Sequence, residues 1–308
     1  MSTLLESAAQ YLALRRSLGF KLGRPGKLVA QFASFCQTAG IDTVTTEMAL
    51  RWARLPATRR SLWWAYRLNA VRGFARYLHA IDPRHEVPPS DLLPPGPRRA
   101  DPFIYSQTEI ATLLSAAGNL PHPLMSATYR TYIGLLAVTG MRAGEAIALD
   151  YGDVNWSESL LVVRNAKFGK SREIVLHLTT LVALREYDSQ RRRHMPRPRT
   201  SAFFVSTVGT RLNYNNVAVV FHELTRRIGL GPRSVRCRPR LHDLRHTFAV
   251  STILDWYRTG LDAAERMHLL TTYLGHTQPA YTYWYLSATP ELLAMVGQRL
   301  ELQLGDLA

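Results

Sequence analysis

Six prolines lie within VPPSDLLPPGPRRADP, the stretch that runs from Val87 to Pro102. Proline has no backbone amide hydrogen to donate, and it disfavours the helical conformation in the residue before it. A regular helix or strand therefore cannot run through this stretch. At 308 residues the chain is also too long for one ordinary hydrophobic core. We predict an N-terminal domain over residues 1–87, an extended linker over residues 88–102 and a second domain over residues 103–308.

The N-terminal domain is predicted to be helical. Apolar residues recur there at three- and four-residue spacing, for example over residues 28–35 and 71–78. Arginines interleave with tryptophans and tyrosines in the same domain, and we expect the aromatic side chains to fill the core. The arginines are expected to contact the phosphates of DNA. The candidates for this contact are Arg59, Arg60 and Arg67 in the domain and Arg98 and Arg99 in the linker.

The second domain is predicted to be mainly helical. It opens with Ser106–Ala117, where Ser106 and Glu109 have the spacing of a capping box at a helix N-terminus. An apolar helical pattern follows over Tyr129–Leu149, and it is broken at Thr139-Gly140. From residue 180 onward the pattern is again mostly helical.

A small antiparallel sheet is expected in the middle of this domain. Asp153–Val163 and Glu173–Leu176 are rich in β-branched residues, and the polar stretch Asn165–Arg172 lies between them. Its turn would carry Lys167 and Lys170. The predicted fold class is therefore mainly α with a small antiparallel β-sheet, in which a helical domain precedes a mixed α/β domain.

The charge of the chain favours a polyanionic partner. Thirty-eight Lys and Arg stand against 23 Asp and Glu, which gives a formal net charge of +15. Cys36 and Cys237 are isolated, which indicates a reducing compartment without a disulfide framework or a structural zinc site. The chain has no signal-peptide pattern and no apolar run long enough to span a membrane. We expect a cytoplasmic, nucleoid-associated protein that binds double-stranded DNA.

Basic residues and a tyrosine recur in an order that suits phosphoryl transfer. Attack on a phosphodiester builds negative charge on its non-bridging oxygens, and a guanidinium presents two rigid donors to such oxygens. A tyrosine phenol can attack phosphorus and can leave again when the reaction reverses. The residues that would form this site are Arg142 in TGMRAGE, His242 and Arg245 in HDLRH, His276 in LGH, and Tyr285 nine residues after His276.

This ordered set resembles the catalytic signature of the tyrosine recombinase (phage integrase) family. The resemblance implies that Lys167 protonates the departing ribose oxygen, with Lys170 as the alternative. Glu145 resembles the family's acidic residue that holds the cluster together. Tyr281 and Tyr283 also follow His276, but the family's spacing favours Tyr285 as the nucleophile. No metal or other cofactor is implied.

By the same resemblance, the chain is expected to be a site-specific recombinase or integrase of a mobile element, with a helical DNA-clamping domain before a mixed α/β catalytic domain. It would form a 3′-phosphotyrosine intermediate and exchange strands through a Holliday junction. Four protomers would assemble on two DNA sites, with accessory recombinases or DNA-bending proteins as further partners. The apolar stripe in Pro290–Leu302 would dock onto a neighbouring protomer.

Three other functions fit parts of the sequence. His242 and His246 have the spacing of two zinc ligands on a helix, but Arg245 between them would repel a cation. A non-catalytic DNA-binding regulator would explain the charge and the linker, although binding alone requires no tyrosine after LGH. A topoisomerase would use the same phosphotyrosine step without needing a pair of specific sites.

Overall fold

The computed structural model describes residues 3–55, 61–94, 100–164, 171–276 and 278–287. The chain divides into two compact units, Met1–Arg99 and Ala100–Ala308, and the division falls within the proline-rich stretch. Mainly helical structure with one small sheet confirms the predicted fold class. Across the described ranges, no helix is both long and apolar enough to cross a membrane.

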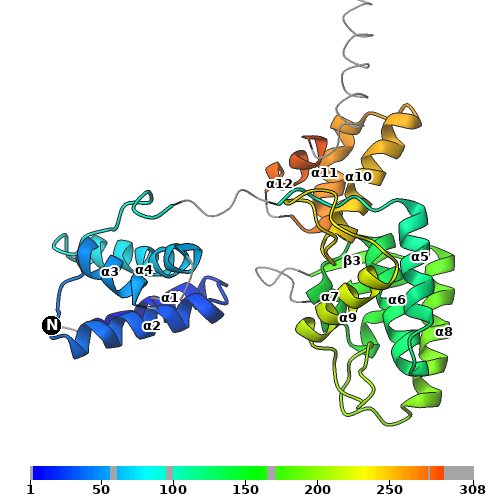
Figure 1. The fold of residues 1–308 in the computed structure, drawn as a ribbon, viewed down its shortest axis with the longest axis horizontal. Helices are drawn as coiled ribbons and strands as arrows, with labels where there is room; N and C mark the ends of the chain where they lie inside the picture. Colours follow the sequence, from blue (N-terminus) through cyan, green and yellow to red (C-terminus); the bar gives the residue numbers. More distant parts are fainter. Residues whose placement is uncertain (1–2, 56–60, 95–99, 165–170, 277, 288–308) are drawn as a thin grey trace, which may run out of the picture. The chain divides into compact units, whose positions relative to one another are not determined.

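The N-terminal unit is built from four helices (Figure 1). They are α1 (Leu4–Ser17), α2 (Gly23–Thr38), α3 (Thr46–Arg54) and α4 (Ser61–Ile81). The apolar series predicted over residues 28–35 and 71–78 face the core of this unit, where Phe32 and Phe74 are fully buried. Trp63 and Trp64 are partly buried and pack against the same core as expected, whereas Tyr66 of the same helix is 39% exposed.

The first residues of the predicted linker belong to the N-terminal unit. Leu93 is buried in its core. Arg72 of α4 donates from Nε to the Pro88 carbonyl at 2.7 Å and from Nη2 to the Pro89 carbonyl at 2.8 Å. Proline lacks an amide hydrogen but keeps its carbonyl as an acceptor, so a guanidinium can hold this segment where no helix or strand can. The unit therefore extends beyond residue 87.

Among its described residues, the second unit contains eight more α-helices and a three-stranded antiparallel sheet in the order β1-β2-β3. Leu161 of β2 pairs with Ile174 of β3, and both are buried. The helices are α5 (Gln107–Gly118), α6 (Pro123–Thr139), α7 (Ala143–Ala148), α8 (Leu178–His194), α9 (Tyr214–Arg227), α10 (Asp243–Arg258) and α11 (Ala263–Leu274). The strands are β1 (Val154–Asn155), β2 (Leu160–Val163) and β3 (Arg172–Val175), and the short α12 (Ala280–Tyr283) leads into a 3₁₀ turn, η3 (Trp284–Ser287).

Two local signals in this unit are confirmed. The Ser106 hydroxyl accepts from the Glu109 amide, and the Glu109 carboxylate accepts from the Ser106 amide, which completes the predicted capping box at α5. Helix α6 ends at Gly140, whose φ of 58° lies in the left-handed region. A Cβ at this position would lie 2.4 Å from Cδ1 of Phe248. Only glycine fits here, and the chain turns at once into α7.

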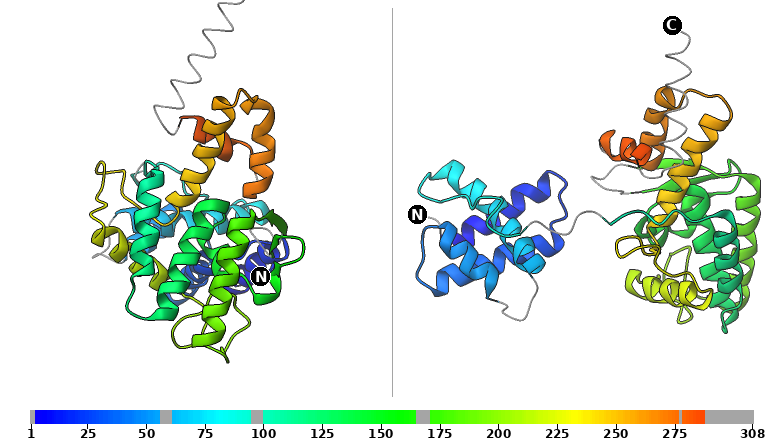
Figure 2. Two further views of the ribbon diagram at one scale, coloured as in Figure 1. Left: turned by 90° about the vertical axis from the view of Figure 1, so that its right-hand side faces the viewer. Right: turned by 45° about the horizontal axis from the view of Figure 1, so that its top comes forward.

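Two hydrophobic clusters make up the interior of the second unit. One joins α5, α6, α8, α9 and the sheet, and the other joins α10, α11 and the 3₁₀ turn. Tyr285 belongs to the second cluster. Figure 2 shows α10 and α11 (yellow-orange to orange) at one end of this unit, while α5, α6 and α8 (green) form the body. Helix α10 packs on α6, so residues from both clusters meet beside the turn that ends α6.

Candidate active site

Arg142 and Glu145 are fixed by the start of α7. Arg142 is the N-cap residue of this helix, and its amide donates to Oε2 of Glu145 at 2.9 Å. Its guanidinium Nη1 donates to Oε1 of the same carboxylate at 2.7 Å. The spacing of three residues in TGMRAGE thus forms a local ion pair, and Arg142 is held at the end of the α6–α7 turn.

Arg172, at the start of β3, is a member of the site that the sequence analysis did not select. Its Nη2 and Nη1 donate to Glu145 at 2.8 and 3.2 Å, and its Nε donates to the Tyr273 carbonyl at 2.9 Å. Both partners are distant in sequence: Glu145 lies 27 residues from Arg172, and Tyr273 lies 101 residues from it. The signal available in the sequence was a third basic residue in NAKFGKSR, after the two lysines.

The Glu145 carboxylate is ionised in this setting. Burial alone would raise its pKa, but hydrogen bonds and charge from Arg172, followed by hydrogen bonds from Arg142, lower the pKa to about 2. One carboxylate therefore holds two guanidiniums that come from α7 and from β3. This agrees with the supporting role that the sequence analysis gave to Glu145.

Arg245 of α10 is buried, with 2% of the residue exposed. Its Nη1 donates to the Gly140 carbonyl at 2.9 Å, and its Nη2 donates to the Leu274 carbonyl at 2.7 Å. Burial and the nearby charge of Arg142 lower the pKa of Arg245 to about 10. The guanidinium is thus still charged at neutral pH, and it connects the end of α6 to the end of α11.

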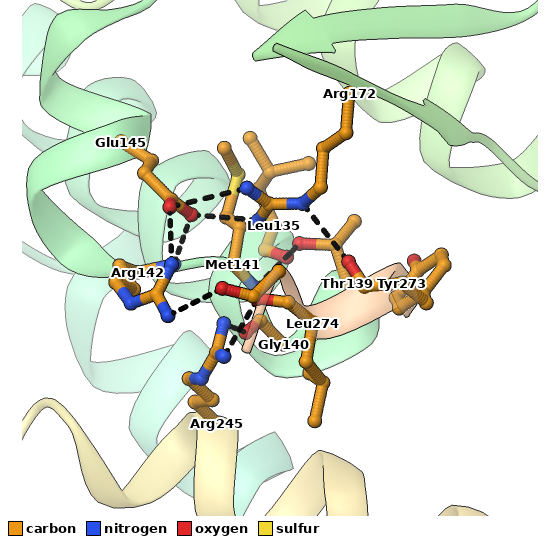
Figure 3. A network of polar contacts seen from close by, with 11 residues as sticks. Leu135, Thr139, Gly140, Met141, Arg142, Glu145, Arg172, Arg245, Tyr273 and Leu274 are labelled. Carbon is orange, nitrogen blue, oxygen red and sulfur yellow. Dashed lines mark hydrogen bonds and ion pairs between the residues drawn. The ribbon is translucent and has the colours of Figure 1, made fainter. Parts of the chain in front are cut away.

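The three arginines meet on one short stretch of backbone (Figure 3). Arg172 donates to the Tyr273 carbonyl, Arg245 to the Leu274 carbonyl and Arg142, at 3.0 Å, to the Gly275 carbonyl. The last carbonyls of a helix lack partners within the helix and carry the negative end of its dipole. We call Arg142, Arg172 and Arg245 the arginine cluster. It caps α11 and fixes the turn that precedes His276.

Gly275 allows this close approach. Its φ of 65° places it in the left-handed region, and it forms the C-cap of α11. A Cβ at this position would lie 3.1 Å from Nη1 of Arg172. The glycine in the LGH motif therefore serves both the helix end and the packing of the arginine cluster.

His276 and Tyr285 lie against each other on the far side of this turn. Nδ1 of His276 is 2.7 Å from Oγ1 of Thr282, which fixes the ring. The ring stacks on Tyr285 with centroids 6.2 Å apart and an interplanar angle of 23°. Tyr285 is 2% exposed, and its hydroxyl lies 3.1 Å from Nδ1 of His246.

The three candidate tyrosines differ sharply in their surroundings. Tyr281 and Tyr283 are 47% and 48% exposed. Tyr281 meets the edge of the His276 ring, with centroids 6.2 Å apart. Tyr285 is enclosed by His246, His276 and Trp284, so its hydroxyl has a defined hydrogen-bonding environment. The structure therefore brings Tyr285 into the same assembly as the two histidines.

His242 occupies the N-cap position of α10 and is exposed. Its ring contacts the ring of His246 edge to face, with centroids 4.8 Å apart. The motif HDLRH thus contributes an exposed imidazole, a buried guanidinium and a second, buried imidazole. The sequence analysis considered that second imidazole, His246, only as a zinc ligand. Within the described ranges, no group of three or more His, Cys, Asp or Glu could hold a metal ion.

Arg67 lies in the core of the N-terminal unit, which corrects its expected place on the DNA surface. Its guanidinium lies 3.6 Å from the centroid of the Trp52 ring and donates to the Trp52 carbonyl at 3.0 Å. Burial of the alkyl stem and the guanidinium leaves Arg67 8% exposed. The other predicted DNA contacts and the candidate lysines fall outside the described residues, as does the tail. These are Arg59, Arg60, Arg98, Arg99, Lys167, Lys170 and Pro290–Leu302.

Comparison with known proteins identifies relatives of this chain. Residues 105–291 match the model of the phage integrase family. The y4rB protein of Sinorhizobium fredii, named as a candidate integrase/recombinase, is 42% identical over 98% of both chains. The tyrosine recombinase XerC of Azotobacter vinelandii is 27% identical, and the match covers 87% of this chain and 85% of that one.

Solved structures show the same fold. The integrase of transposon Tn1549, in complex with a circular intermediate DNA, matches with a TM-score of 0.64 at 16% identity, over 97% of this chain and 100% of that chain. The XerA recombinase matches with a TM-score of 0.52 at 24% identity, over 97% of both chains. A family match over residues 105–291 and a relative 42% identical along nearly its whole length show that this chain belongs to the tyrosine recombinase (phage integrase) family.

Proposed function

We propose that this protein is a site-specific DNA recombinase that cleaves and rejoins DNA through a 3′-phosphotyrosine intermediate on Tyr285. The observation that carries the proposal is the convergence of the arginine cluster, His276 and the buried Tyr285 on the turn that ends α11. Relatives that are named integrase or recombinase favour this function over a DNA-binding regulator or a topoisomerase.

The charge balance of the site suits a phosphodiester. The arginine cluster carries three positive charges, and the Glu145 carboxylate, which bonds two of the three guanidiniums, carries one negative charge, which leaves an excess of two positive charges. In the transition state, negative charge grows on the non-bridging phosphate oxygens, and preorganised donors stabilise it there. Arg142 and Arg245 would supply these donors, with His242 and His276 as further donors beside them. Arg172 would act through Glu145 and the turn.

Lys167 would protonate the departing ribose oxygen. It lies in the segment between β2 and β3, and β3 begins at Arg172, which is bonded to Glu145 and to the end of α11. Lys167 precedes Arg172 by five residues, so the chain connects it closely to a residue of the site. Lys170 is the alternative general acid.

Neither a divalent metal nor ATP would be required. The guanidiniums supply the positive charge that a metal would otherwise bring, and the phosphotyrosine ester keeps the energy of the broken bond. Strand cleavage should proceed at the same rate with EDTA and without added nucleotide. Cleavage that stops in chelator and returns only with magnesium would contradict this proposal.

The partners would be double-stranded DNA sites and further copies of this chain. The Tn1549 relative was solved with circular intermediate DNA, and a lambda integrase dimer was solved on a core site. By analogy, the helical N-terminal unit would clamp the DNA. Four protomers would exchange strands through a Holliday junction in the nucleoid, helped by the docking of residues 290–302 and by accessory recombinases or DNA-bending proteins.

The test is substitution of the nucleophile. On DNA nicked close to the scissile phosphate, the cleaved flank diffuses away and the covalent protein–DNA adduct accumulates. Tyr285→Phe should abolish this adduct while single-site DNA binding is kept. Tyr283→Phe is the matched control, because that phenol is two residues away and exposed. An adduct that survives Tyr285→Phe but is lost in Tyr283→Phe would overturn the assignment.

A further inference from the structure

The hydroxyl of Tyr285 has a hydrogen-bonding partner that is not among the residues to which a catalytic role is given above. It lies 3.1 Å from Nδ1 of His246, with ring centroids 5.4 Å apart. Both residues are buried, Tyr285 with 2% and His246 with 4% exposed. A phenol in such a place cannot hand its proton directly to bulk water. Its proton needs an acceptor inside the protein, and His246 is in hydrogen-bonding reach.

A buried carboxylate faces the other nitrogen of the same imidazole. Oδ1 of Asp243 lies 4.0 Å from Nε2 of His246, one helical turn earlier on α10, and Asp243 is fully buried. Nδ1 can accept the phenol proton only if Nε2 carries the ring hydrogen. A carboxylate near Nε2 favours that tautomer. It also stabilises the imidazolium that forms once the proton has moved.

Asp243 is itself held rigidly. Arg240 donates to it from Nε at 2.9 Å and from Nη2 at 2.7 Å. Burial raises the pKa of Asp243, whereas Arg240 opposes that rise through hydrogen bonds and charge. Tyr285, His246 and Asp243 therefore form a series of three buried groups, in which the imidazole has the phenol near one ring nitrogen and the carboxylate near the other.

The other polar and aromatic groups around His246 restrain its ring. The His242 ring meets it edge to face at 4.8 Å from the same helix, and the Trp284 ring of η3 lies 5.5 Å away. On the other side of Tyr285, His276 stacks on the phenol. The imidazole is thus fixed in one orientation toward the tyrosine hydroxyl.

We propose that His246 is the general base that accepts the phenol proton of Tyr285, and that Asp243 orients it. The proposal rests on the function proposed above. The O–H bond of Tyr285 breaks, and its proton moves to Nδ1. The phenol oxygen bonds to phosphorus while the bond from phosphorus to the 5′ oxygen breaks, and that oxygen takes a proton from the general acid. During rejoining, the 5′ hydroxyl gives its proton back to the deprotonated general acid and attacks phosphorus, the bond from phosphorus to the phenol oxygen breaks, and His246 returns its proton to that oxygen.

The test combines a variant of the base with a more acidic nucleophile. Glutamine at position 246 can still hydrogen-bond to the phenol, but it cannot take up a proton at neutral pH. His246→Gln should slow single-turnover cleavage of nicked DNA by roughly 10²–10⁴-fold, the usual range for a general base. Fluorinated tyrosine, placed at position 285 by suppression of a stop codon, ionises more readily. The defect of His246→Gln should then shrink to less than about tenfold.

His242→Gln is the matched control on the same helix. Its defect should be equal with tyrosine and with fluorinated tyrosine, because this residue would contact phosphate rather than the phenol. Replacement of the leaving 5′ oxygen by sulfur should not rescue His246→Gln, whereas it should rescue Lys167→Ala. A defect of His246→Gln that is the same with both phenols would overturn the proposal. Absence of any adduct with the unsubstituted protein would instead overturn the proposed function.

A second measurement does not depend on the folding of His246→Gln. In the full chain labelled with ¹⁵N-histidine, the His246 ring is identified by the change that Tyr285→Phe causes in its signals. A proton on Nε2 and a bare Nδ1 are expected. A proton on Nδ1 would make His246 the donor to the tyrosine oxygen, and the proposal would be wrong.

Discussion

Buried arginines occur in both units, but the groups that surround them differ. In the N-terminal unit, Arg67 stacks on Trp52 and donates to its carbonyl, and Arg72 donates to Pro88 and Pro89. Each guanidinium is held by carbonyls in its own surroundings. In the catalytic unit, the arginine cluster shares three consecutive carbonyls and one carboxylate within a single site.

The difference separates structural arginines from functional ones. A lone buried guanidinium that is covered by a ring and bonded to a carbonyl holds two segments together. Adjacent guanidiniums repel one another, and the charge of Arg142 contributes to the lowered pKa of Arg245. The cluster therefore carries a cost in the free protein that binding of an anionic phosphate relieves. Crowding of like charge distinguishes the site more clearly than burial does.

The largest expected effect is on the rate of strand cleavage, and it is found by comparing two single variants, one with an arginine replaced in each unit. Arg245→Lys keeps the charge but cannot bridge Gly140, Leu274 and a phosphate with one rigid fork. Strand cleavage should slow by roughly 10²–10³-fold, as for loss of a preorganised donor. Arg67→Lys should leave the cleavage rate of the folded protein unchanged. Single-turnover cleavage of nicked DNA measures both, and equal slowing in the two variants would remove the distinction between the units.

A second prediction concerns acid, because the arginine cluster is held by one buried carboxylate, Glu145, that bonds both Arg142 and Arg172. The pKa of Glu145 is lowered from an ordinary value of 4.5 to about 2. Its stabilisation is therefore present above about pH 4.5 and is lost as the pH falls to about 2. At neutral pH, Glu145→Gln should lower the free energy of unfolding of the catalytic unit by about 3 kcal/mol.

The difference in the free energy of unfolding between Glu145→Gln and the unsubstituted protein should shrink as the pH falls from about 4.5 to about 2. Urea unfolding at a series of pH values, followed by tryptophan fluorescence, measures it. Arg67 and Arg72 have no such acidic partner in hydrogen-bonding contact, so the N-terminal unit supplies the internal reference. A difference that stays constant down to pH 2 would show that Glu145 does not act through its charge.

The smallest effect is expected for Arg72→Lys. A lysine keeps the charge but replaces the two parallel bonds to Pro88 and Pro89 by at most one well-aligned bond. The free energy of unfolding of the N-terminal unit should fall by about 1–2 kcal/mol. Cleavage by the folded protein should be unaltered. Thermal melts detect the first effect, and cleavage that is much slower than in the unsubstituted protein would give Arg72 a role beyond structure.

The sequence predicted what depends on local spacing. TGMRAGE places Glu145 three residues from Arg142, and the pair forms within one turn of α7. LGH places a left-handed glycine at the end of α11, as a helix terminus requires. The capping box at Ser106 and the break at Gly140 follow from the same kind of local rule. Such features need no knowledge of the rest of the fold.

What the sequence could not predict depends on partners that are distant along the chain. Arg172 was passed over because Glu145 and Tyr273 lie 27 and 101 residues from it. Arg67 was expected on the surface because the sequence does not show that Trp52 covers its guanidinium. His246 gained a role only once the fold brought Tyr285, 39 residues away, to its ring. These contacts are set by tertiary packing.

The cap on α11 also sets an order of events during synthesis. Its three donors come from residues 142, 172 and 245, whereas its acceptors come last, at residues 273–275. Domains fold from the N-terminal end as the chain emerges from the ribosome. The donors are thus made long before the backbone that gathers them, and contacts over 133 residues close late. A nascent chain can hold a folded N-terminal unit without a working centre, so the capacity to cut DNA would arise only after residues 273–275 have been made and have folded.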